Sequence, residues 1–171
     1  GVNHFNDGNY EQALSRLNEA IRLDADDAEA FSYRGQAQSG LGRHQQAIED
    51  FNKALDLDPS LTLAYYGRGV AQSSLGQDEQ AVADFDAALE LDSALADAYH
   101  SRGAAHERLG QPQQAAQDYE KAGAAYADLG QHQQSLDDFH RAIALEPSSA
   151  SAYDGRGAAH HNLGQHEPAI A

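Results

Sequence analysis

The chain has 171 residues, a formal net charge of −16 and no cysteine. Because the chain is acidic and its 11 lysines and arginines form no basic stripe, we expect no nucleic acid partner. The lack of cysteine excludes disulfides, thiol nucleophiles and thiolate metal sites. No apolar run reaches the roughly 18 residues that a membrane-spanning helix needs, so we expect no membrane insertion.

Glycines mark a repeat along the chain. The intervals are 34, 34, 34, 20 and 34 residues between Gly8, Gly42, Gly76, Gly110, Gly130 and Gly164. Residues 28–61, AEAFSYRGQAQSGLGRHQQAIEDFNKALDLDPSL, show one full unit. Apolar and small residues keep helical spacing on both sides of its Leu-Gly turn, and Pro59 follows the second half, where proline stops a helix. Each unit is therefore predicted to form a helix-turn-helix hairpin.

The 34-residue period and these residue types resemble the tetratricopeptide repeat, over almost the entire chain. This resemblance implies an all-α fold, an α-α superhelix built as a solenoid of antiparallel helix hairpins. The sequence pattern begins and ends inside helices, so we expect a segment of a longer repeat protein.

The 20-residue interval is fourteen residues short of the period. A loss of fourteen residues shifts the helical phase by only about 40°, so one helix can run through the join. Helical spacings of 4, 3, 4 and 3 residues separate Ala115, Tyr119, Ala122, Tyr126 and Leu129. With proline in the first turn and Gly130 at the stop, the pattern predicts one merged helix over about 112–129.

The merged helix divides the chain into three expected parts. Residues 1–110 hold repeats one to four, the first of them partial; residues 111–130 hold the merged helix; and residues 131–171 hold repeats five and six, the last partial. One helix does not fit both the concave and the convex row of the family's superhelix. Three outcomes stay open: a kink or reversal near 110–130, a homodimer formed through this region or the open ends, or local repacking.

Arginine and aspartate recur on opposite sides of the turn, each eight residues from it. An antiparallel hairpin brings such positions together. We therefore predict three ion pairs: Arg34 with Asp50, Arg68 with Asp84, and Arg102 with Asp118. In the merged unit Ala122 takes the arginine position, which leaves Asp138 without its arginine.

No pattern in the sequence indicates catalysis, a metal or a cofactor. Most of the nine histidines repeat at two positions of the unit, and stacked units are on the order of 10 Å apart, too far to share a metal. The glycine pairs in 67–72 and 155–160 lack the third glycine of a dinucleotide loop and follow no strand. We expect a protein that is not an enzyme.

In the tetratricopeptide repeat family, set positions of each first helix line the concave groove. The resemblance implies these peptide-binding candidates: Gln36, Ser39, Leu63, Tyr66, Val70, Ser73, His100, Glu107 and Arg108. Leu63, Tyr66 and Val70 make an apolar patch typical of protein contacts, although Tyr66 and Val70 could equally pack against the adjacent unit. The lysines and asparagines with which family members clamp a terminal carboxylate are absent here, which favours an internal peptide with apolar anchors.

The leading hypothesis is a non-enzymatic scaffold that binds a protein or peptide segment in this groove. Two alternatives stay open. The chain could be the regulatory or substrate-recognition arm of a larger enzyme, or a module that assembles with copies of itself.

Overall fold

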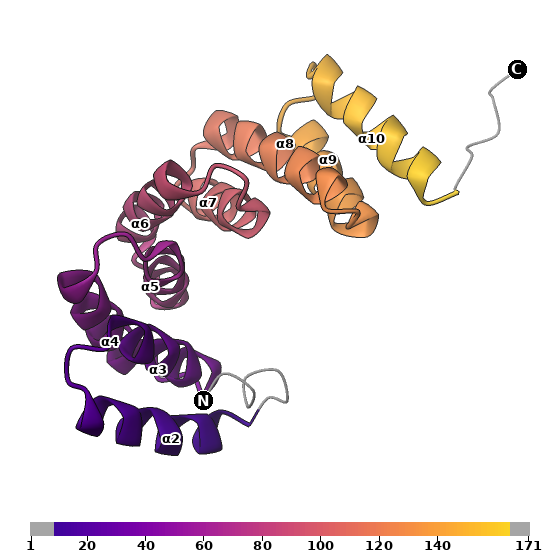
Figure 1. The fold of residues 1–171 in the computed structure, drawn as a ribbon. Coiled ribbons are helices and arrows are strands. Elements are labelled where there is room, and N and C mark those ends of the chain that lie inside the picture. The colour runs from indigo at the N-terminus through magenta and orange to yellow at the C-terminus, as the bar shows by residue number, and fades with distance from the viewer. Residues whose placement is uncertain (1–8, 165–171) are drawn as a thin grey trace, which may run out of the picture. The chain divides into compact units, whose positions relative to one another are not determined.

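The structure is a computed structural model that describes residues 9–164. These residues form nine α-helices and no strand, which confirms the all-α prediction. In chain order (Figure 1) the helices are α2 (Tyr10–Leu23), α3 (Ala28–Gly40), α4 (His44–Leu57), α5 (Thr62–Ser74), α6 (Asp78–Leu91), α7 (Ala96–Arg108), α8 (Pro112–Asp128), α9 (His132–Leu145) and α10 (Ala150–Asn162). No described helix is both long enough and apolar enough to span a membrane.

The predicted Leu-Gly turns end the helices as expected. Gly42, which follows α3, has a φ of 74°, a left-handed conformation that side-chain-bearing residues rarely adopt. The next residue, Arg43, donates its backbone N–H to the carbonyl of Gln38 at 2.8 Å and closes the turn. The same conformation recurs at four further turns, at Gly76, Gly110, Gly130 and Gly164; Gly8, the first of the series, lies outside the described residues.

Each hairpin closes around an aromatic ring of its second helix. Phe51 of α4 and Phe85 of α6 are fully excluded from solvent, and burial of such a side chain stabilises a fold by about 1.5–3 kcal/mol. The facing residue of the first helix is a glycine: a β-carbon on Gly35 would lie 2.9 Å from the Phe51 ring, and one on Gly69 would lie 2.7 Å from Phe85. Small residues thus let the helices approach closely around one large ring.

All three predicted arginine–aspartate pairs are present. In the α5–α6 hairpin, Arg68 Nε donates to Asp84 Oδ2 at 2.7 Å and Nη2 donates to Oδ1 at 2.6 Å. The same two-bond arrangement joins Arg34 to Asp50 and Arg102 to Asp118. The aspartates are almost completely buried, so the pairs hold the two helices of each hairpin together.

Contacts divide the helices into two compact units, one ending at Asp92 and one beginning at Ser93. In the first, α2 packs on α3, α3 on α4, α4 on α5 and α5 on α6, and α3 also contacts α5. In the second, α7 packs on α8, α8 on α9 and α9 on α10, and α10 also contacts α8. The predicted division into three parts, at residues 110 and 130, follows the boundaries of the sequence repeats. It does not describe contacts between helices, and it stays a prediction.

The merged helix is present as α8, which ends at Asp128, one residue before the predicted end. It has two hairpin partners because it packs against both α7 and α9. Toward α7 it presents the fully buried Tyr119, whose ring lies 3.3 Å from a β-carbon built on Gly103. Toward α9 it presents Gly123, where a β-carbon would lie 3.1 Å from the Phe139 ring. One helix therefore serves as the second helix of one hairpin and the first helix of the next.

Candidate functional site

Helices α3 and α5 bring five of the nine groove candidates around one hollow. Leu63, Tyr66 and Val70 follow one face of α5 at spacings of three and four residues, and Gln36 and Ser39 follow the facing side of α3. Together with two further residues they surround a cavity of about 270 Å³. The apolar patch expected from the sequence is thus one wall of a real hollow.

The two further lining residues are Phe51 of α4 and Gly67 of α5. A β-carbon on Gly67 would lie 2.4 Å from the Phe51 ring, so the glycine allows the ring to reach the base of the hollow. Sequence reasoning missed both residues for this site because it considered only set positions of each first helix, and Phe51 belongs to a second helix while Gly67 is not at one of those positions. The glycine at 67, where the preceding unit has Tyr33, is the one signal that could have indicated a recess.

The residues that line the hollow differ in how far they are exposed and in whether they already contact other side chains of the protein. Leu63 is 50% exposed. Tyr66 packs its ring 6.0 Å from that of Phe85, centroid to centroid, within its own hairpin, and the alternative of packing against the adjacent unit stays a prediction. Ser39 Oγ is buried and has no hydrogen-bond partner among the described residues. The hollow therefore combines an exposed apolar rim with an unused hydroxyl.

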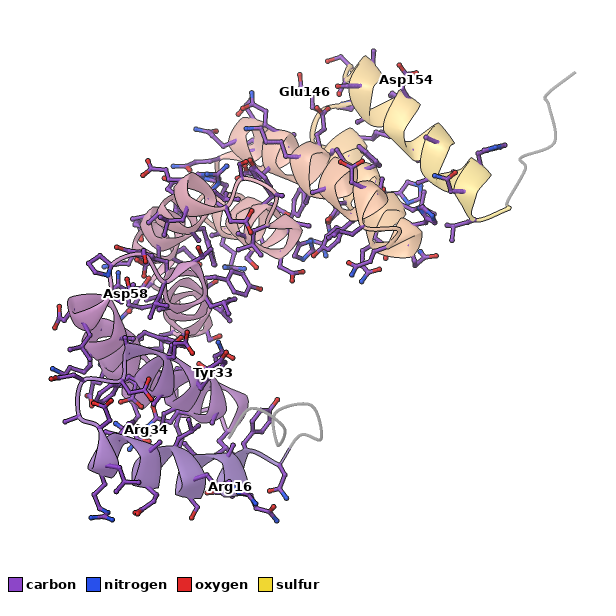
Figure 2. The ribbon with its side chains drawn as sticks, viewed as in Figure 1. Arg16, Tyr33, Arg34, Asp58, Glu146 and Asp154 are labelled. Atoms are coloured by element: carbon purple, nitrogen blue, oxygen red, sulfur yellow. The ribbon has the colours of Figure 1, made fainter. Side chains whose placement is uncertain are left out.

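A second, smaller hollow of about 160 Å³ adjoins the first and shares Leu63 with it. Its lining comes from the start of α3 and from the segment that leads into α5: Glu29, Ser32, Tyr33, Ser60, Leu61, Thr62 and Leu63. Tyr33 can be located on α3 in Figure 2. This second hollow is more polar in character because it contains a carboxylate, a phenol and three aliphatic hydroxyls.

The remaining four candidates do not line either hollow. Ser73, near the end of α5, hydrogen-bonds Asp78 at 3.3 Å. His100, Glu107 and Arg108 all belong to α7 in the second unit. The nine candidates therefore divide into a cluster on α3 and α5 and a separate group on α7.

His100 has a structural partner that the sequence did not indicate. Its Nδ1 lies 2.7 Å from Oδ1 of Asp138 on α9, the aspartate that lacks an arginine. Asp138 is 1% exposed, and its Oδ2 has no partner among the described residues. The hydrogen bond to Asp138 raises the pKa of His100 above its ordinary value.

Glu107 and Arg108 line a polar hollow of about 240 Å³ together with Ala104 and Arg141. The Tyr119 hydroxyl donates to Glu107 Oε2 at 3.0 Å and accepts from Arg141 Nη1 at 3.2 Å. Burial, together with the bond to Glu107, raises the pKa of Tyr119 to about 12. Arg141 of α9 was missed because the groove candidates were taken from the first helix of each unit, and α9 is the second helix of its unit.

Stacked antiparallel hairpins, each with a small-residue face against an aromatic ring, define a helical repeat protein. Models of the tetratricopeptide repeat match residues 1–62 and residues 73–110 and 123–164. The interruption between 110 and 123 falls largely within α8. The chain belongs to the tetratricopeptide repeat family, and as such it is a protein–protein interaction scaffold.

Solved structures of repeat proteins share the fold. They include MamA 41-end from Desulfovibrio magneticus RS-1, which is 26% identical with a TM-score of 0.65 over 85% of this chain and 90% of that one. TTC0263, a thermophilic TPR protein from Thermus thermophilus, is 21% identical with a TM-score of 0.65 over 95% of each chain. YrrB, described as a TPR protein with an unusual peptide-binding site, is 23% identical with a TM-score of 0.56 over 90% of this chain and 87% of its own. No curated protein matches the chain.

Proposed function

We propose that this chain binds an internal peptide segment along α3 and α5, with an apolar side chain inserted between Leu63, Tyr66 and Val70. The observation that carries this proposal is the hollow of about 270 Å³ with its apolar wall on the first helices of two adjacent hairpins. Full burial of a leucine or phenylalanine side chain contributes about 1.5–3 kcal/mol.

Polar groups beside this wall suit a peptide main chain. The Gln36 amide lines the hollow and can both donate and accept a hydrogen bond, whereas the Ser39 hydroxyl oxygen is buried beneath the surface. Nothing in this arrangement supplies a nucleophile with its base, so we propose that the unit works by binding and has no catalytic activity of its own. Peptide capture of this kind agrees with the scaffold role of the family.

Selection from a phage-displayed library of random dodecapeptides tests the proposal. We expect enriched peptides to share one large apolar residue and to bind the Leu63→Ala variant about tenfold more weakly, as loss of about 1.4 kcal/mol implies. Leu91→Ala is the matched control, because Leu91 on α6 is exposed to a similar extent, 47% against 50%, but does not line the hollow. Enriched peptides that bind Leu63→Ala as tightly as the unaltered protein would refute the site.

A further inference from the structure

The two adjoining hollows on α3 and α5 differ in chemistry, and this difference bears on the kind of peptide that fits. The first is walled by Leu63, Tyr66 and Val70. The second lies beyond Leu63, toward the start of α3. Glu29 of the second hollow and Gln36 of the first are seven residues apart on α3, a rise of about 10 Å along the helix.

Groups that attract a cation gather at the second hollow. Glu29 contributes an exposed carboxylate, and Tyr33 contributes an aromatic ring, whose face attracts ammonium and guanidinium groups. A lysine or arginine side chain matches this set, whereas an acidic side chain would face repulsion.

The net negative charge of the first unit also favours a positively charged peptide segment. Through Asp92 the sequence has 17 aspartates and glutamates against 6 lysines and arginines. Two of these six, Arg34 and Arg68, are already paired with buried aspartates. An excess of negative charge of this size attracts cationic segments and increases their association rate.

We infer, as a refinement that rests on the proposed function, that the partner segment is an extended peptide with an apolar anchor and a lysine or arginine about three residues from it. The apolar side chain fills the hollow at Leu63, Tyr66 and Val70, and the cation lies between Glu29 and Tyr33. The spacing follows because an extended chain advances about 3.3 Å per residue, so about three residues cover the rise between the two hollows.

A positional scan with synthetic peptides tests this arrangement. The probes are fluorescein-labelled dodecapeptides of serine, glycine and glutamine with one fixed phenylalanine. In the scan, a single lysine occupies each position from one to five residues on either side, and a matched series carries glutamine instead. Affinities are measured by fluorescence polarisation at low and at physiological salt, against the unaltered protein, Glu29→Gln and Glu49→Gln. The last variant removes the same charge from an exposed position on α4 that lines neither hollow.

We expect lysine to strengthen binding about two- to fivefold at three residues from phenylalanine, the range that exposed ion pairs provide. Physiological salt and the Glu29→Gln substitution should each remove this increase in affinity, whereas Glu49→Gln should preserve it. Phenylalanine peptides that bind equally well wherever the lysine stands, in all three proteins, would overturn the inference and leave the proposed function intact. The same peptides are also measured against Leu63→Ala. Phenylalanine peptides that do not bind the unaltered protein, or that bind Leu63→Ala as tightly, would overturn the proposed function and this refinement with it.

Discussion

His100 Nδ1 and Asp138 Oδ1 lie 2.7 Å apart and join α7 to α9 across the merged helix α8. In three regular hairpins the equivalent aspartate is neutralised by an arginine from the preceding helix. Helix α8 has Ala122 at that arginine position, so a buried carboxylate would otherwise lack a cation. Asp138 is thus paired with a histidine, whose charge depends on pH, where the other three aspartates are paired with an arginine, whose charge is permanent.

The second unit is therefore predicted to lose stability as pH rises. The pKa of His100 is higher in the folded protein than its usual value near 6.5. Its stabilising contribution is complete below the unfolded-state pKa and is lost as pH increases through the raised folded-state pKa. Because His100 is 42% exposed in its side chain, we expect a modest decrease in the melting temperature between about pH 6 and pH 8.

Melting curves at several pH values, with an NMR titration of the His100 ring, measure this effect. His100→Gln should flatten the pH dependence, whereas His161→Gln, at an exposed histidine of α10, should leave it in place. Identical pH profiles for the unaltered protein and His100→Gln would contradict the assigned role.

Removal of one partner from a regular arginine–aspartate pair is predicted to decrease the stability of the protein strongly. Asp84→Ala leaves the guanidinium of Arg68, only 20% exposed, without its carboxylate. We expect a decrease of about 3 kcal/mol in the free energy of unfolding, at the low end for a broken buried pair. Urea denaturation checks the value, and Asp86→Ala on the same helix is the control because Asp86 is exposed. A loss below about 1 kcal/mol, the range of surface pairs, would show that the pair is marginal.

Two glycine substitutions should have opposite effects on stability. A β-carbon on Gly67 would lie 2.4 Å from the Phe51 ring, whereas one on Gly157 of α10 would have no neighbour within 4 Å. Gly67→Ala should destabilise by about 1–3 kcal/mol through overpacking. Gly157→Ala should stabilise by about 0.4–1 kcal/mol, because alanine favours the helix and restricts the unfolded chain. Thermal melts of both variants provide the comparison, and equal shifts would contradict the tight approach of α5 to Phe51.

Tyr119→Phe is predicted to be mild although the side chain is fully buried. Phenylalanine already fills the equivalent place at Phe51, Phe85 and Phe139, so the ring should still fit. The lost hydroxyl bonds to the partly exposed Glu107 and Arg141 should cost about 1 kcal/mol or less. Tyr119→Ala, in contrast, should cost about 3–5 kcal/mol through the cavity it creates. Comparable losses for the two variants, measured by urea denaturation, would mean that the hydroxyl bonds stabilise α8 as much as the ring does.

Features that repeat within one hairpin were predictable from the sequence. The turns, the arginine–aspartate pairs and the helix from Pro112 depend on spacings along the chain, which fix what two antiparallel neighbours share. The partner of Asp138 was not predictable, because His100 lies 38 residues away and on a helix that belongs to another hairpin. Phe51 under the first hollow was missed for a similar reason: its place at the base of the hollow depends on the missing side chain of Gly67 on the next hairpin.

Binding of a peptide across α3 and α5 can be observed residue by residue with NMR. A phenylalanine-anchored peptide is titrated into ¹⁵N-labelled protein, and the shifts of the backbone amides are mapped. We expect saturable shifts concentrated around Gln36, Ser39, Leu63, Tyr66 and Val70, and a much weaker response in Leu63→Ala. Saturable shifts confined to α7–α10, or identical maps for the two proteins, would show that the peptide does not bind at the hollow between α3 and α5.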